Sequence, residues 1–257
     1  PGVPIDSPLV EVFQKKNVPV IGEIELASQF AKGKIVAITG TNGKTTTKEL
    51  VSAVLARRYN VLFTEGNFNN DIGVPKTLFR LTPEHDIAVV EMGASHPGDI
   101  RTLVNLVEPT CGLITNVGRA HLQGFGSLDG VLHTKGELYD FLRTDKDSVT
   151  FINTDNPLLM SIADGLPRTV SYGRGEGVAV RGEVTGCAPF LCFRWQAEAA
   201  GDGWHEVSTH LIGAYNMDNM LAAITVGLHF GVAPADICRA LEDYVPGNNR
   251  SQLTLSL

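Results

Sequence analysis

A glycine-rich turn between an apolar run and a helix-forming segment constrains the fold of this chain most. Residues 35–47 read IVAITGTNGKTTT. In a P-loop, glycines let consecutive backbone N–H groups point at phosphate oxygens, a lysine neutralises the β- and γ-phosphates, and the next hydroxyl binds Mg²⁺. Because such a turn joins a buried strand to a helix, it predicts an α/β sheet with a phosphate site at one edge.

Four residues supply the parts of this motif, namely Gly40, Gly43, Lys44 and Thr45. Only two residues separate the glycines, whereas the common P-loop has four there, so the segment is a variant of the motif. The alternative is an ordinary glycine turn that caps a helix. That alternative has to explain an apolar strand on one side, a helix on the other and a Lys-Thr pair in place.

The rest of the chain predicts an α/β fold, with a mostly parallel P-loop sheet flanked by helices, because apolar β-branched runs alternate with helical patterns. The predicted strands cover residues 35–39, 87–91, 111–115 and 148–153, and the predicted helices cover 45–57, 98–107, 128–142, 216–230 and 234–241. The runs 178–184, 190–195 and 207–212 follow one another without a helix. A small antiparallel sheet is therefore expected near residues 178–212.

The composition excludes several classes of protein. A net charge of −7, with 43% hydrophobic and 19% charged residues, disfavours a disordered chain and a nucleic-acid-binding protein. No apolar run approaches the roughly 20 residues of a membrane helix, and no signal segment opens the chain, so we expect a cytoplasmic protein without membrane insertion. The four cysteines show no zinc-like pairing and are expected to be reduced core thiols.

Two residues that follow predicted strands are candidate metal ligands. Glu91 ends the run IAVVE, and a carboxylate at the carboxyl end of a parallel strand lies beside the ligand crevice, where it can hold Mg²⁺. The alternative is an acid that is merely solvated at the rim of the sheet. His121 follows another strand in a glycine-rich loop, and it is either a structural histidine or a ligand.

The predicted helix over residues 128–142 carries a lysine near the centre of its apolar stripe. At about 100° per residue, Lys135 falls within the stripe, and Glu137 falls on the opposite, solvent-facing side. A lysine is rarely buried without a partner, because desolvation of the ammonium group is costly. Lys135 therefore either extends out along the edge of the core or reaches a polar site that uses its charge or changes it chemically.

Six segments resemble, in their order along the chain, motifs of the Mur ligases of peptidoglycan synthesis. They are TGTNGKTTT (39–47), TEGNFNNDIG (64–73), VEMGASH (90–96), ITNVGRAHL (114–122), TKGE (134–137) and GAYNMDN (213–219). Within the family they look most like the members that add D-Ala-D-Ala. Residues 1–33 look more like the end of the N-terminal domain of the D-glutamate-adding members, so this opening segment is interpreted as a remnant or a graft.

The resemblance implies an ATP-dependent amide ligase with ATP and Mg²⁺ as cofactors. ATP would phosphorylate the terminal carboxylate of a UDP-N-acetylmuramoyl tripeptide, giving an acyl phosphate and ADP. The amine of D-Ala-D-Ala would then attack and expel phosphate. The enzyme has to hold two anions in line against their repulsion, which is work for Mg²⁺, lysine and backbone N–H groups. We expect a monomer.

The same resemblance assigns roles to the metal-site and nucleotide-loop residues. Thr45 and Glu91 would bind one Mg²⁺, and His121 would help to hold a second. Lys135 matches the lysine that the family carbamylates, which turns an ammonium into a carboxylate-like metal ligand. The loop that would bind the β- and γ-phosphates consists of Gly40, Thr41, Asn42, Gly43, Lys44, Thr45 and Thr46.

Further polar residues match substrate-binding positions of the family. Asn216 and Asn219 match residues that contact adenine, with helix capping as the alternative. Arg250 matches an arginine near the phosphates, with a solvated linker charge as the alternative. The loop placed near the UDP-peptide substrate carries Asn67, Asn69 and Asn70, which are alternatively turn formers.

The family comparison divides the chain into a remnant or graft (1–33), a central ATP-binding domain (34–245) and a linker (246–257) to a C-terminal domain. Without that domain we expect weak nucleotide binding and no ligation. Three alternatives remain at this point. They are a D-glutamate-adding ligase or another family member such as a folylpolyglutamate or cyanophycin enzyme, a non-catalytic nucleotide-binding fragment, and a P-loop NTPase switch.

Overall fold

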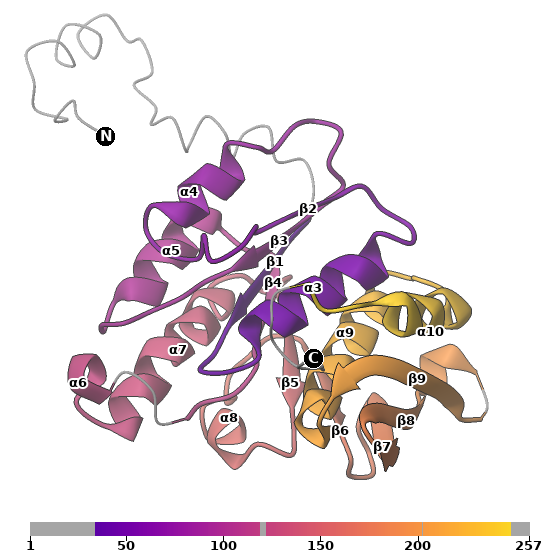
Figure 1. The fold of residues 1–257 in the computed structure, drawn as a ribbon. Helices are drawn as coiled ribbons and strands as arrows, with labels where there is room; N and C mark the ends of the chain where they lie inside the picture. Colours follow the sequence, from indigo (N-terminus) through magenta and orange to yellow (C-terminus); the bar gives the residue numbers. More distant parts are fainter. Residues whose placement is uncertain (1–33, 119–121, 202, 248–257) are drawn as a thin grey trace, which may run out of the picture.

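The computed structural model describes residues 34–118, 122–201 and 203–247, and within them one nine-stranded sheet in the order β2-β3-β1-β4-β5-β6-β7-β8-β9 (Figure 1). The strands are β1 (Lys34–Thr39), β2 (Val61–Phe63), β3 (Ile87–Glu91), β4 (Cys111–Ile114), β5 (Val149–Asn153), β6 (Thr169–Gly173), β7 (Val180–Cys187), β8 (Phe190–Gln196) and β9 (His205–Ile212). Neighbouring strands from β2 to β7 are parallel, and β7, β8 and β9 pair antiparallel. The expected antiparallel strands are confirmed, and they extend the main sheet.

Helices cover both faces of this sheet. Figure 1 shows α4, α5 and α7 on one face and α3, α9 and α10 on the other. The helices are α3 (Lys44–Leu55), α4 (Gly73–Leu78), α5 (Asp99–Val107), α6 (Leu122–Phe125), α7 (Leu128–Leu142), α8 (Pro157–Ser161), α9 (Met217–His229) and α10 (Pro234–Asp243), with short 3-10 turns η1 (Glu198–Ala200) and η2 (Ala214–Asn216). None of the described helices has the length and apolar character needed to cross a membrane.

The order of the strands places a ligand crevice beside β1. From β1 the chain passes to β2 and β3 on one side and then crosses to β4 on the other. Ile38 of β1 pairs with Glu91 of β3, and Thr39 pairs with Ile114 of β4. The carboxyl ends of these three strands therefore meet at a point where the strand order reverses, which is where open α/β sheets bind ligands.

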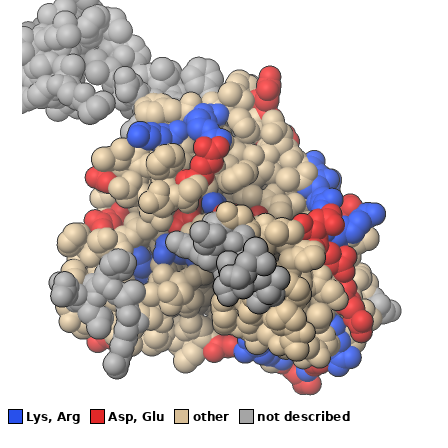
Figure 2. Space-filling view, in the orientation of Figure 1, with Lys and Arg blue, Asp and Glu red and all other residues tan. Residues whose placement is uncertain are grey.

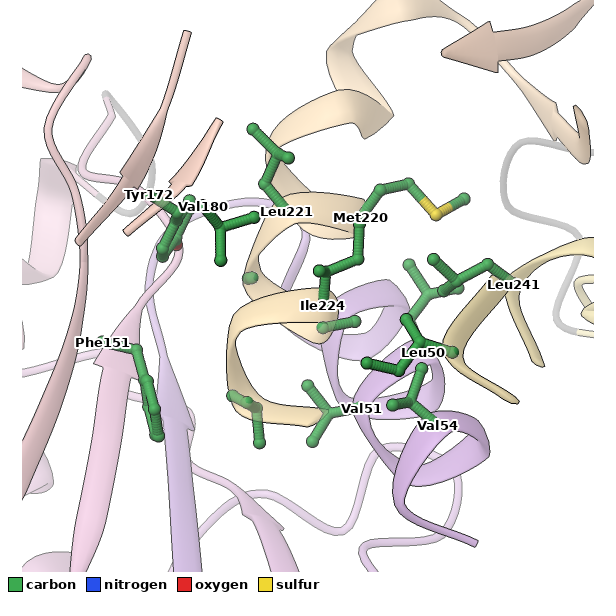
Figure 3. Close-up of a cluster of buried hydrophobic side chains, with 14 of the residues drawn as sticks. Leu50, Val51, Val54, Phe151, Tyr172, Val180, Met220, Leu221, Ile224 and Leu241 are labelled. Atoms are coloured by element: carbon green, nitrogen blue, oxygen red, sulfur yellow. The ribbon is translucent and has the colours of Figure 1, made fainter. Parts of the chain in front are cut away.

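Helix α9 forms the centre of the larger apolar core. It packs against α3 and α10 on one side and against β5, β6 and β7 on the other, as the side chains in Figure 3 show. Gly227 of α9 allows this close approach, because a Cβ atom there would lie 2.5 Å from Val54 Cγ1 of α3. The packing fixes α3, and with it the helix end that carries the glycine-rich turn.

The cysteines and helix α7 test two of the sequence predictions. The predicted core thiols are confirmed for Cys111, but Cys187 is exposed, and Cys192 and Cys238 are half-buried. Cys187 is the last residue of β7, directly before the turn to β8, and not part of the core of the sheet. The bounds of the predicted helix 128–142 agree with α7, whose first turn is capped by Ser127 Oγ accepting from Gly130 N at 3.0 Å.

Candidate functional site

The turn between β1 and α3 has a backbone that requires glycine at two positions. Gly40 has φ 141°, and a Cβ atom there would lie 2.1 Å from Thr115 Oγ1. Gly43 has φ 76°, and its Cβ would lie 2.6 Å from Asn219 Oδ1. Both positions combine a positive φ with a close neighbour, so a side chain would be strained and would also clash. The predicted variant P-loop thus has the strand-turn-helix context that the motif needs.

The segment after β4 holds this turn in place. Thr41 N donates to Asn116 O at 2.9 Å, and Asn42 N donates to Asn116 Oδ1 at 2.9 Å. Thr115 Oγ1 donates to Asn42 O at 2.6 Å. Thr115 ends a predicted strand, as Glu91 does, and Asn116 directly follows it, but neither residue was among the predicted site residues. The segment that follows β4 therefore holds the turn in a fixed shape.

Lys44 folds back over the turn, where its Nζ donates to Gly40 O at 2.8 Å and to Thr41 O at 3.1 Å. Two pockets meet around it. A pocket of about 830 Å³ includes Thr45, Glu91, Asn216 and Asn219 in its lining. A second pocket, of about 650 Å³, extends toward α5 and α7. Thr41, Lys44 and Asn69 line both pockets.

Glu91 is a buried carboxylate, 1% exposed, at the end of β3. Its Oε1 accepts from Thr45 Oγ1 at 3.2 Å and from Asn69 Nδ2 at 2.8 Å. Its Oε2 is buried and has no hydrogen-bond partner within the described part of the chain. Burial rules out the solvated-rim alternative. An unpartnered carboxylate oxygen beside a threonine hydroxyl fits a hard cation such as Mg²⁺. The described residues contain no cluster of three or more His, Cys, Asp or Glu side chains suited to a metal.

Lys135 is 3% exposed and lines the second pocket, so it does not extend out along the core edge. Its Nζ lies 5.6 Å from the centroid of the Phe125 ring and makes no hydrogen bond or ion pair with the residues that the structure describes. Desolvation, reinforced by the charge of Lys44, lowers the pKa of Lys135 to about 8, against the opposing influence of Asp99 and Glu137.

The prediction that Glu137 faces solvent is wrong. Glu137 is 7% exposed, and its carboxylate accepts from Gly98 N at 3.0 Å and from Arg101 N at 2.8 Å. These N–H groups belong to the first turn of α5, where unsatisfied donors and the helix dipole attract an anion. Helical periodicity describes only the helix on which Glu137 lies, so it cannot reveal that the start of another helix packs against this side.

Asn216 and Asn219 form a chain of side-chain hydrogen bonds between α3 and α9. Asn219 Oδ1 accepts from Thr47 Oγ1 at 3.0 Å, and Asn219 Nδ2 donates to Asn216 Oδ1 at 2.9 Å. Asn216 Nδ2 donates to Ile212 O at 2.9 Å, and the Asn216 side chain does not cap α9. Beside them Tyr215, 67% exposed, lines the larger pocket. Tyr215 was not among the predicted site residues, although it lies inside the GAYNMDN motif.

The three loop asparagines divide between the two pockets. Asn67 lines the larger pocket, Asn70 lines the second, and Asn69 lines both. Asn70 also acts as a turn former, because its Oδ1 accepts from Gly73 N at 2.8 Å. The structure does not describe His121, Arg250 or residues 1–33. The roles predicted for the two residues, and the interpretation of the opening segment, therefore stay predictions.

Charged side chains of both signs are interspersed over the face of the molecule in Figure 2, which displays no continuous basic surface. The larger pocket, by contrast, combines the Lys44 ammonium group with the buried carboxylate of Glu91 and the buried amides of Asn216 and Asn219, and the second pocket contains Lys44 and the buried Lys135. Local arrangement of polar groups, and not overall charge, therefore distinguishes the site.

Known proteins resemble this chain in sequence. The UDP-N-acetylmuramoyl-tripeptide--D-alanyl-D-alanine ligase of Escherichia coli (strain K12) is 44% identical over 154 residues, which are 60% of this chain and 34% of the relative. The protein of the same name from Haemophilus influenzae is 38% identical over 216 residues, 81% of this chain and 46% of the relative. The chain thus spans less than half the length of these relatives.

Solved structures share the fold. MurF from Acinetobacter baumannii superposes with a TM-score of 0.82 at 32% identity, over 91% of this chain and 51% of that chain. MurF ligase from Thermotoga maritima in complex with ADP superposes with a TM-score of 0.75 at 27% identity, over 88% of this chain and 53% of that chain. The family model of the Mur ligase middle domain matches residues 38–227. The resemblance read from the motifs is thereby confirmed, and the chain belongs to the Mur ligase family.

Proposed function

We propose that this chain is the ATP-binding part of an amide ligase that adds D-Ala-D-Ala to a UDP-N-acetylmuramoyl tripeptide. The observation that carries the proposal is the meeting of two pockets at Lys44 and Asn69. Transfer of a phosphoryl group to a carboxylate requires two anions side by side, with a cation between them. The names of the curated relatives support the choice of substrates.

The larger pocket would hold ATP. The N–H groups of the turn and the Lys44 ammonium would bind the β- and γ-phosphates, and Tyr215, Asn216 and Asn219 line the same pocket, where they would contact the rest of the nucleotide. Thr45 and Glu91 would hold Mg²⁺, which when bound would neutralise charge on the transferred phosphoryl group. Asn69 would orient Glu91 through its 2.8 Å hydrogen bond to Oε1.

The second pocket would hold the acceptor carboxylate near Lys135. Because burial lowers its pKa to about 8, Lys135 is unprotonated near neutral pH far more often than an ordinary lysine. In that form its nitrogen lone pair can attack the carbon of CO₂ and lose a proton, which gives a carbamate anion. We propose that Lys135 acts as this carbamate, because a carbamate removes the buried positive charge and supplies an oxygen ligand for a metal.

The carboxylate oxygen would then attack the γ-phosphorus, giving an acyl phosphate and ADP. The amine of D-Ala-D-Ala would attack the acyl carbon, and phosphate would leave with the electron pair of the broken C–O bond. Lys44, placed between the pockets, would offset the repulsion between the two anions.

The test joins this chain to the part of the Haemophilus influenzae relative that follows the matched region. The fused enzyme receives ATP, Mg²⁺ and one of two pairs of substrates, and the products are identified by mass spectrometry. The pairs are UDP-N-acetylmuramoyl tripeptide with D-Ala-D-Ala, and UDP-N-acetylmuramoyl-L-Ala with D-Glu. We expect product from the first pair alone. Product from the second pair alone would contradict the proposal and favour a D-glutamate-adding ligase.

A further inference from the structure

Lys48 is a buried ammonium group that the proposed function does not use. It lies on α3, one turn after Lys44, and is 1% exposed. Burial of a lysine is costly unless partners compensate for lost hydration, and a second cation one turn from Lys44 adds repulsion. An apolar side chain at this core position would avoid the free-energy cost of burying a charge. The contacts that Lys48 makes therefore need an explanation.

These contacts tie α3 to the end of β2. Lys48 Nζ donates to Thr64 O at 2.7 Å, and Thr64 directly follows β2. The same nitrogen lies 5.7 Å from the centroid of the Phe63 ring and 3.6 Å from Glu49 Oε1. A carbonyl, an aromatic face and a carboxylate thus share the ammonium group, and two of the three belong to residues 63 and 64.

Thr64 in turn holds Glu91. Its hydroxyl, completely buried, accepts from Glu91 N at 3.0 Å, and its own N–H donates to Val89 O at 3.1 Å. The loop that begins after Thr64 carries Asn69, whose Nδ2 donates to Glu91 Oε1 at 2.8 Å. Lys48 therefore holds the residue that bonds the backbone of Glu91 and that precedes the loop carrying Asn69.

We propose that Lys48 is a positioning residue that holds Glu91, through Thr64, in the place where its carboxylate can bind Mg²⁺. The proposal rests on the proposed function, because it takes Glu91 and Thr45 as the metal-binding pair. Groups that orient a metal ligand typically change metal affinity by about 10-fold to 100-fold when they are removed. Lys48 does not line either of the two pockets, so we expect its removal to leave the turn's own contacts with phosphate in place.

The experiment measures the affinity of the full chain for β,γ-imido-ATP by calorimetry, once with Mg²⁺ and once with a chelator. For Lys48→Met we expect roughly a 10-fold or greater loss of affinity with Mg²⁺ and less than about a 2-fold loss without it. The matched control is Lys76→Met, because Lys76 is exposed and its Nζ also lies over an aromatic ring, 5.6 Å from the centroid of Phe68. The control should behave as wild type in both conditions.

Thr64→Val provides a second variant in case Lys48→Met does not fold. It removes the hydroxyl that accepts from Glu91 N and keeps the shape of the side chain. We expect the same Mg²⁺-selective loss, and recovery of affinity in Thr64→Ser, which restores a hydroxyl group. A structural role of Thr64 alone would lower both affinities together.

The outcomes separate this inference from the proposed function. If wild-type affinity does not depend on Mg²⁺, the proposed function fails, and the inference fails with it. The inference alone is overturned if wild-type affinity depends on Mg²⁺ but Lys48→Met keeps the wild-type ratio of the affinity with Mg²⁺ to the affinity without it. If Lys48→Met does not fold, the same test applies to Thr64→Val. An equal loss in both conditions also overturns the inference, because Lys48 would then support the phosphate loop in general.

Discussion

The two lysines of the site have opposite surroundings. Lys44 donates two hydrogen bonds to carbonyl groups of the turn, and the turn itself is fixed by Thr115 and Asn116. Lys135 is buried against Phe125, and its pKa is lowered to about 8. The comparison shows that on the proposed nucleotide side hydrogen bonds hold Lys44 and the turn in place, whereas on the proposed acceptor side Lys135 is a desolvated amine. A turn held by hydrogen bonds is suited to binding a ligand in one geometry, and a desolvated amine such as Lys135 is more reactive because it loses its proton more easily.

The strongest challenge to this comparison is Lys135→Ala in the fused enzyme. Ligation should fall by at least about 100-fold, the scale on which loss of one charge-stabilising group acts. If Lys135 supplies a carbamate, added short carboxylic acids should restore part of the rate. Lys146→Ala, at an exposed lysine, serves as the control and should leave the rate unchanged. Recovery with added amines would instead mean that Lys135 acts as a cation.

Glu91→Gln examines the nucleotide side. The amide oxygen of glutamine can still accept from Thr45 and Asn69, so these contacts should remain. The negative charge of Glu91 is lost. Mg²⁺-dependent nucleotide affinity should fall by about 10-fold to 100-fold, as measured by calorimetry. Glu176→Gln, at a side chain that is 91% exposed, should have no effect. Unchanged Mg²⁺ dependence in Glu91→Gln would remove Glu91 from the metal site.

Gly227→Ala tests whether the close contact between α3 and α9 holds the turn at the start of α3 rigidly. The new Cβ atom would lie 2.5 Å from Val54 Cγ1, inside the α3–α9 contact. We expect the free energy of unfolding to fall by about 1–3 kcal/mol in urea titrations. Gly175→Ala is the matched control, because its Cβ would have nothing within 4 Å. Equal stabilities of the two variants would show that α3 and α9 adjust easily.

The pH dependence of acetylation tests whether Lys135 is a desolvated amine with a lowered pKa. An amine reacts with acetylating reagents only when unprotonated, so lowering the pKa of Lys135 from 10.5 to about 8 moves its reactivity to lower pH. The rate of acetylation at Lys135, followed by peptide mass spectrometry, should rise through a midpoint near pH 8. A midpoint at the ordinary lysine value of 10.5 would mean that this amine is well hydrated.

The sequence predicted the features that depend on neighbouring residues. The strand, glycine turn and Lys-Thr pair lie within residues 35–47, so one short segment carries the whole P-loop signal. The anomaly of Lys135 was visible for the same reason, because helical periodicity relates residues within one helix. In the structure the turn joins β1 to α3, and Lys135 is buried.

Features that depend on contacts between distant segments were missed or wrong. Glu137 receives its hydrogen bonds from α5, and Asn116 holds a turn 74 residues earlier in the chain. The hydrogen bond from Lys48 to Thr64 can reach Glu91 only because β2 pairs with β3. Hydrogen bonds of this kind follow from tertiary packing, and no local pattern of residue types specifies them.

The most direct measurement of the central claim follows the oxygen atoms of the acceptor carboxylate. UDP-N-acetylmuramoyl tripeptide labelled with ¹⁸O in its terminal carboxylate is ligated to D-Ala-D-Ala by the fused enzyme, and the released phosphate is analysed by mass spectrometry. If the carboxylate attacks the γ-phosphorus across the two pockets, each phosphate should carry one ¹⁸O atom. Phosphate without label, released together with the ligated product, would contradict an acyl phosphate and the account of the site that depends on it.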